Sequence, residues 1–178
     1  MELAAQIISI GGMIFNLISF QQKVYKRALL CQMFSTVFFG ISYFMLGATV
    51  GGILNIVAMI RSVVFLFKEK TRADNVFWMI FFIVSFILSY PAAFLLFGKE
   101  PSVKNLVTEI FPIIAMTLAT VSIRIGSTKA IRWLGLFASP LWLTYNICSL
   151  SLGATLCEIL NLISITVGII RFDRKDKK

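Results

Sequence analysis

Seven apolar segments, separated by short polar or charged stretches, make up almost the whole sequence. Each has about the 20 residues that a helix needs to cross roughly 30 Å of hydrocarbon. The chain is 58% hydrophobic with a mean hydropathy of +0.90, more than a soluble domain of 178 residues uses for its core. Strands would leave backbone groups without partners in lipid, so the sequence predicts an all-α integral membrane protein. The expected spans are residues 3–20, 28–46, 50–68, 76–97, 105–123, 130–149 and 153–171.

The charged residues predict how these spans are oriented. One set of span ends carries Lys23, Lys26, Arg27, Lys68, Lys70, Arg72, Arg124, Lys129, Arg132, Arg171, Arg174, Lys175, Lys177 and Lys178. The opposite ends carry only Lys99 and Lys104. Basic residues favour the cytoplasmic side, which predicts an N-terminus outside and a C-terminus in the cytoplasm. Because the net charge of +9 is concentrated beside apolar spans, the expected partner is the bilayer and nucleic acid is excluded.

An internal repeat suggests how the spans are grouped. Residues 46–55 (LGATVGGILN) and 152–161 (LGATLCEILN) are identical at seven of ten positions. Three crossings reverse the direction of the chain, so a second copy in the same orientation requires one additional crossing. The sequence therefore predicts a single membrane domain with two parallel three-helix repeats, related by an axis along the membrane normal. The expected parts are residues 1–70 as repeat 1, 71–99 as linker helix, and 100–178 as repeat 2 with a basic tail.

Several short motifs, taken in order, carry a resemblance to known families. They are ILN at 53–55 with Arg61, EIFPI at 109–113, LWLTYN at 141–146, GATLCEI at 153–159 and IIRF at 169–172. In these motifs the chain resembles the bacterial inner membrane protein family named for YgjV. Its plan of three, one and three spans looks like that of the SWEET and PQ-loop carriers. The resemblance covers nearly the whole chain and implies a multi-pass protein of the bacterial inner membrane.

The resemblance to SWEET carriers also implies a solute site. In those carriers an Asn on the third helix of each repeat lines a central sugar pocket, helped by an aromatic residue on the preceding helix. The matching amides here are Asn55 and Asn161. The matching aromatic residue is Phe39 in the first repeat and Trp142 or Tyr145 in the second.

The same carriers have prolines in the first two helices of both repeats. This chain has them only in the second repeat, as Pro112 and Pro140, and it contains no Pro-Gln dipeptide. The resemblance therefore implies that Pro112 and Pro140 act in gating, and that the gate is not symmetric. The pair Gly11-Gly12 offers flexibility in the first repeat instead.

Three polar residues inside the apolar spans are candidates for binding. The amides of Asn55 and Asn161 offer donors and acceptors to a solute; alternatively, they hydrogen-bond between helices. Glu158 lies three residues before Asn161, and a carboxylate in a membrane span is costly enough to suggest a function. It is expected to bind a cationic group or couple protons, or else to pair with a neighbouring side chain.

Two further charged residues lie nearer the span ends. Glu109 is expected in a solvated outer vestibule, where together with Glu158 it would attract cations. Arg61 is expected to snorkel toward the cytoplasmic surface. The alternative for Arg61 is that it holds an anionic group or closes an inner gate.

The chain has few of the residue types that build catalytic or metal centres. It contains no His, and its cysteines, Cys31, Cys148 and Cys157, lie within apolar segments, where they are expected to be small buried side chains. No phosphate-binding loop, metal-ligand cluster or nucleophile motif is visible in the sequence. We therefore expect no enzyme activity, no metal and no cofactor.

These observations predict an alternating-access carrier of a small polar solute. Two three-helix bundles would rock around a shared pocket, possible as a monomer or within a homo-oligomer. The alternative is a non-transporting membrane receptor or assembly factor with the same fold. In that case a cytoplasmic protein partner would bind the basic face formed by segments 23–27, 68–72, 124–132 and the C-terminus.

Overall fold

A computed structural model describes residues 2–173 except 47–48, 74, 96–97, 99, 101 and 149–151. The described residues form helices joined by short turns, with no strand among them. The helices are α1 (Glu2–Phe20), α2 (Tyr25–Met45), α3 (Thr49–Leu66), α4 (Lys68–Thr71), α5 (Val76–Leu95), α6 (Val103–Thr108), α7 (Ile110–Ile125), α8 (Thr128–Cys148) and α9 (Leu152–Gly168), which continues into a π-helical turn at Ile169–Asp173. Lys99, residues 47–48 of the repeated segment and the basic tail at 174–178 lie outside the described residues.

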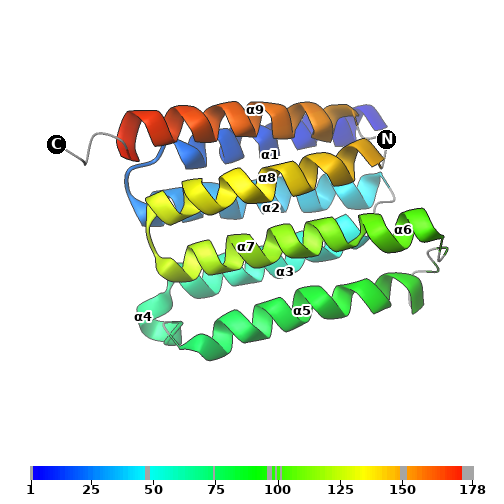
Figure 1. The fold of residues 1–178 in the computed structure, drawn as a ribbon, viewed down its shortest axis with the longest axis horizontal. Coiled ribbons are helices and arrows are strands. Elements are labelled where there is room, and N and C mark those ends of the chain that lie inside the picture. The colour runs from blue at the N-terminus through cyan, green and yellow to red at the C-terminus, as the bar shows by residue number, and fades with distance from the viewer. Residues whose placement is uncertain are drawn as a thin grey trace.

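The long helices form two layers, with α1, α2 and α3 in one and α7, α8 and α9 in the other (Figure 1). Within each layer consecutive helices pack side by side, and the layers meet where α1 packs on α9 and α3 packs on α7. Helix α5 packs on α3 and α7 and covers one edge of both layers. The central helices α2 and α8, which face each other across the layers, do not pack closely on one another, so space remains in the middle of the bundle.

The surface of the bundle is apolar and much of its interior is polar. On α1, residues Leu3, Ile7, Ile10, Ile14 and Ile18 recur every three or four positions and are exposed. The buried polar residues include Ser35, Asn55, Arg61, Thr120, Ser139, Asn146 and Asn161. A soluble protein has the opposite distribution, since its polar side chains face water. The pattern is that of helices surrounded by lipid, with polar groups turned toward the bundle interior.

Four helical segments are both long and apolar enough to cross a bilayer. They are Leu3–Phe20, Tyr25–Met45, Val103–Ile125 and Ala154–Asp173, and Val50–Leu66 and Val76–Ala92 are shorter apolar helices. The third expected span ends early because the helix breaks at Phe67, before α4. Helix α8 is long but carries Lys129 and Arg132 in its first two turns, which lowers its apolar character. The seven crossings predicted above therefore remain a prediction.

The turns predicted to be basic do gather at one end of the bundle. The α1–α2 turn, α4, the α7–α8 turn and the π turn at Ile169–Asp173 lie together there, and the start of α1 lies at the other end (Figure 1). We call this the basic end; its exposed basic residues include Lys23, Lys26, Arg27, Lys70, Arg72, Arg124, Lys129 and Arg171. Arg132 does not belong to this surface, because it is 3% exposed and pairs with Asp173 inside the fold.

Candidate functional site

A cavity of about 140 Å³ lies between the two layers. This volume would hold on the order of ten water molecules, or a small organic solute. All six helices of the two layers contribute to its wall. The lining residues are Asn16, Phe20, Gln32, Ser35, Thr36, Phe39, Tyr43, Asn55, Arg61, Ala115, Met116, Ala119, Ser122, Ile131, Gly135, Ala138, Ser139, Trp142, Asn146, Ala154, Cys157, Glu158 and Asn161.

The cavity follows the long axis of the bundle. Tyr43 and Ala154 lie within two residues of the helix ends opposite the basic end. Phe20 and Ser122 lie within three residues of the helix ends at the basic end. The lined space therefore extends over most of the distance that the helices cover.

Both predicted asparagines line this cavity, Asn55 from α3 and Asn161 from α9. Each amide nitrogen donates to the residue four positions earlier: Asn55 Nδ2 to the Gly51 carbonyl at 2.8 Å, and Asn161 Nδ2 to Cys157 Sγ at 3.9 Å. Asn161 is only 1% exposed, and its Oδ1 makes no hydrogen bond within the described part of the chain. A buried acceptor without a donor costs about 1–3 kcal/mol, so this oxygen is suited to accept from water or a solute in the cavity.

Glu158 lines the cavity close to Asn161, and the two side chains interact. The Ser139 hydroxyl on α8 donates a hydrogen bond to Glu158 Oε2. Ser139 is buried and lines the cavity, but it is not among the residues predicted from the sequence. Its position directly before Pro140 in an apolar segment was the only available signal.

Some of the aromatic residues line the cavity, and Tyr145 packs behind one of them. Phe39 and Trp142 line the cavity as predicted, and Tyr43 does so without having been predicted. Tyr145 is buried but does not line the cavity; its ring packs edge-on against Trp142, with centroids 5.8 Å apart. Trp142 is therefore the aromatic residue of the second layer that is in position to contact a solute, and Tyr145 holds its ring in place.

Arg61 lies inside the bundle, and the expectation that it snorkels is wrong. It is 4% exposed and lines the cavity. Its Nη1 donates to the Met116 carbonyl at 3.2 Å and to Thr120 Oγ1 at 2.9 Å, both on α7. Snorkelling requires the charged group to reach water, whereas these acceptors hold the guanidinium between the layers.

Glu109 is also buried, which contradicts its expected place in a solvated vestibule. It is 1% exposed and lies at the break between α6 and α7. Pro112 is buried in the first turn of α7, where the missing N–H of proline is tolerated. Pro140 is exposed within α8. None of these three residues lines the cavity, and their roles in gating remain predictions.

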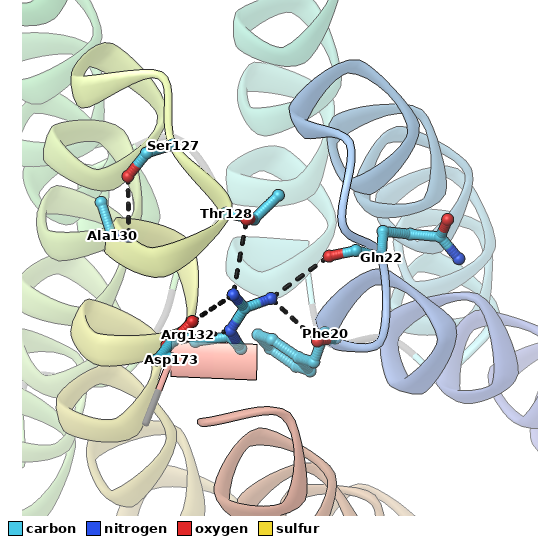
Figure 2. Close-up of polar contacts among 7 residues, drawn as sticks. All are labelled: Phe20, Gln22, Ser127, Thr128, Ala130, Arg132 and Asp173. Carbon is cyan, nitrogen blue, oxygen red and sulfur yellow. Dashed lines mark hydrogen bonds and ion pairs between the residues drawn. The ribbon is translucent and has the colours of Figure 1, made fainter. Parts of the chain in front are cut away.

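A buried ion pair at the basic end was not found from the sequence (Figure 2). Arg132 donates through Nε to Asp173 Oδ2 at 3.1 Å and through Nη2 to Asp173 Oδ1. The same guanidinium donates to the carbonyls of Phe20 and Gln22, at 3.5 and 3.2 Å, and to Thr128 Oγ1 at 3.4 Å. One side chain thus ties the start of α8 to the α1–α2 turn and to the C-terminal π turn.

Further hydrogen bonds connect the layers at this end. The Tyr25 hydroxyl donates to the Ile123 carbonyl at 2.6 Å. Gln21 Nε2 donates to the Ser164 carbonyl at 2.8 Å, and the Ser164 hydroxyl donates to the Leu17 carbonyl at 3.1 Å. These bonds hold the two layers together beside the end of the cavity.

An apolar exterior around a polar interior, on helices of bilayer length, defines an integral membrane protein with an internal cavity. The sequence model of one family, described as bacterial inner membrane protein (Imp-YgjV), matches residues 3–176. The chain belongs to this family of bacterial inner membrane proteins. Comparisons with curated proteins and with solved structures give no match.

Proposed function

We propose that this protein is an alternating-access carrier of a small polar solute. In this proposal the chain crosses the inner membrane seven times, with its N-terminus outside and its C-terminus in the cytoplasm. Helices α1–α3 and α7–α9 are the two moving units, and α5 connects them. The observation that supports it is the polar cavity, which three helices from each half of the chain enclose beneath an apolar surface. Cavities at the interface of two repeats are where carriers of this kind bind their solutes.

The lining residues suggest how a solute would be held. The amides of Asn55 and Asn161 would hydrogen-bond it, Phe39 and Trp142 would pack against it, and Glu158 would select among charged groups. Transport requires no chemical step. Opening toward the basic end would require the bonds that join the layers there to break, among them Tyr25 to Ile123.

The proposal is tested by flux through the purified protein in proteoliposomes. A metabolite that raises its thermal stability identifies a solute, because a ligand that binds only the folded state stabilises it. Uptake of that solute should fall by about tenfold or more in the double variant Asn55→Ala, Asn161→Ala, since each lost hydrogen bond is worth about 0.5–1.5 kcal/mol. Unchanged uptake in the double variant would contradict the site.

Asn75→Ala is the control for this experiment. Asn75 is exposed, and its Oδ1 accepts from the Phe77 N–H at the start of α5, away from the cavity. The control loses the hydrogen bond that caps the start of α5, so its stability should fall slightly. Its uptake rate per folded molecule should not change. Copurification of a stoichiometric protein partner, without flux of any solute, would favour the receptor alternative instead.

The proposed orientation gives a separate prediction about the two termini. A fluorescent protein fused after residue 178 should fold in the cytoplasm, and an alkaline phosphatase fused there should be inactive. A peptide tag added before residue 1 should be accessible to its antibody from the outer face of intact spheroplasts. The number of crossings must be odd for this result. If both termini report the same side of the membrane, the seven-span arrangement is wrong.

A further inference from the structure

Arg61 is a positive charge inside the bundle that no carboxylate balances in the described part of the chain. Its acceptors there, the Met116 carbonyl and the Thr120 hydroxyl, are neutral. The guanidinium carbon also lies 5.6 Å from the centroid of the Phe86 ring on α5. Its Nε–H is buried and makes no hydrogen bond within the described residues. An uncompensated charge in a membrane interior is expensive to keep, and such residues usually mark a pathway or binding site.

Because Arg61 lines the cavity, an anionic group that entered the cavity would provide the missing charge. Carboxylates match the planar donor geometry of a guanidinium and form charge-assisted hydrogen bonds with it. The unused Nε–H supplies a donor that Met116 and Thr120 do not occupy. The structure thus provides one recognition point for an acidic group.

Glu158 lies in the same cavity but toward the opposite end. Asn55 on α3 and Asn161 on α9 occupy equivalent positions in the repeat. Arg61 is six residues beyond Asn55 toward the basic end, and Glu158 is three residues before Asn161 on the other side. With the two copies of the repeat superposed, nine residues at 1.5 Å each put the Cα atoms of Arg61 and Glu158 about 13 Å apart along the helices.

The cavity therefore has a cation toward one end, a carboxylate toward the other, and the amides of Asn55 and Asn161 between them. We infer that its solute is an extended zwitterion, with its carboxylate at Arg61 and its ammonium group at Glu158. Such a solute would balance both charges, whereas a neutral solute would leave both without counter-ions and a simple acid or amine would leave one. The inference rests on the proposed carrier function, because it names the solute class of the same cavity.

A series of linear ω-amino acids tests the inference and measures the spacing. Glycine, β-alanine, 4-aminobutyrate, 6-aminohexanoate and 8-aminooctanoate would be titrated against the purified protein, with affinity measured calorimetrically. Affinity should rise beyond glycine, pass through a maximum at an intermediate length and then fall. The best member should bind about tenfold or more tightly than hexanoate, hexylamine or hexane-1,6-diol, since each close charge pair adds to the affinity.

Matched variants show which charged group of the solute Arg61 binds and which one Glu158 binds. Arg61→Gln should reduce affinity for the best amino acid to that of hexylamine, and Glu158→Gln should reduce it to that of hexanoate. Arg27→Gln and Glu69→Gln, which change exposed residues outside the cavity wall, should bind as the unmodified chain does. Arg61→Lys keeps the charge but loses the planar fork, and its intermediate affinity would report on the site if Arg61→Gln does not fold.

The results separate this inference from the carrier proposal. Equal binding of the diol and the amino acid, absence of binding across the series, or full affinity in Arg61→Gln would overturn the zwitterion. Flux of a neutral solute that depends on Asn55 and Asn161 would also overturn it, while leaving the carrier intact. Length-selective binding of amino acids without flux would support the solute class and refute transport.

Discussion

Replacing Asp173 by Asn is expected to destabilise the folded protein by about 3–5 kcal/mol, because it leaves the buried Arg132 guanidinium without its counter-charge. For a chain of this size the melting temperature should fall by roughly 6–20 °C. The destabilisation should also affect the α1–α2 turn, since Arg132 donates hydrogen bonds to the carbonyls of Phe20 and Gln22. Thermal unfolding in detergent, followed by tryptophan fluorescence, measures the change.

Two comparisons show whether the ion pair itself is responsible. Arg27→Gln removes an exposed arginine at the same end and should change stability by less than about 0.5 kcal/mol. The double variant Arg132→Met, Asp173→Leu removes both charges and should recover most of the loss, because apolar pairs often replace buried ion pairs without penalty. Asp173→Asn melting within about 2 °C of the unmodified protein would contradict the buried pair.

Gly168→Ala is the second substitution with a large expected effect. A Cβ at Gly168 would lie 2.8 Å from the Phe20 carbonyl oxygen and 2.8 Å from Arg132 Cδ. The carbonyl belongs to the backbone at the end of α1, so relief requires α9 to move away from α1. Overpacking of this kind costs about 1–3 kcal/mol and outweighs the better helix propensity of Ala.

Gly40→Ala is the matched control on α2. There an added Cβ would meet Asn55 Cβ at 3.4 Å, an ordinary contact, and the substitution should be neutral or slightly stabilising. Gly168→Ala should therefore melt well below Gly40→Ala in the same detergent. Equal melting temperatures would mean that α9 does not approach α1 as closely as the structure shows.

The sequence predicted the features that depend on local composition or on the repeat. Apolar segments predicted the helices, and basic turns predicted which of their ends lie together. The recurring Asn identified Asn55 and Asn161, which both line the cavity. These features require no knowledge of how each helix is rotated about its axis.

The features that depend on helix rotation and on distant partners could not be predicted. Arg61 looks like a snorkelling residue until Thr120, 59 residues away, is seen to accept its hydrogen bond. Arg132 looks like a flanking charge because its partner Asp173 is 41 residues distant and lies among other charges. Glu109 lies at the break between α6 and α7, three residues before Pro112, and this proline marks the break but does not show that Glu109 is buried.

Alternating access requires that one cavity connect in turn with the two sides of the membrane. Its ends carry small residues, Ala154 away from the basic end and Ser122 beside it, and both line the cavity. In a chain freed of its native cysteines, Ala154→Cys and Ser122→Cys place one reactive thiol at either end. The native cysteines to be replaced are Cys31, Cys148 and Cys157.

Labelling these thiols in oriented proteoliposomes with a membrane-impermeant reagent is the most direct measurement of alternating access. The thiol at 154 should react only from the side of the N-terminus, and the thiol at 122 only from the side of the basic end. Reaction of both thiols from a single side, or no reaction at 122 from the basic end, would contradict alternating access.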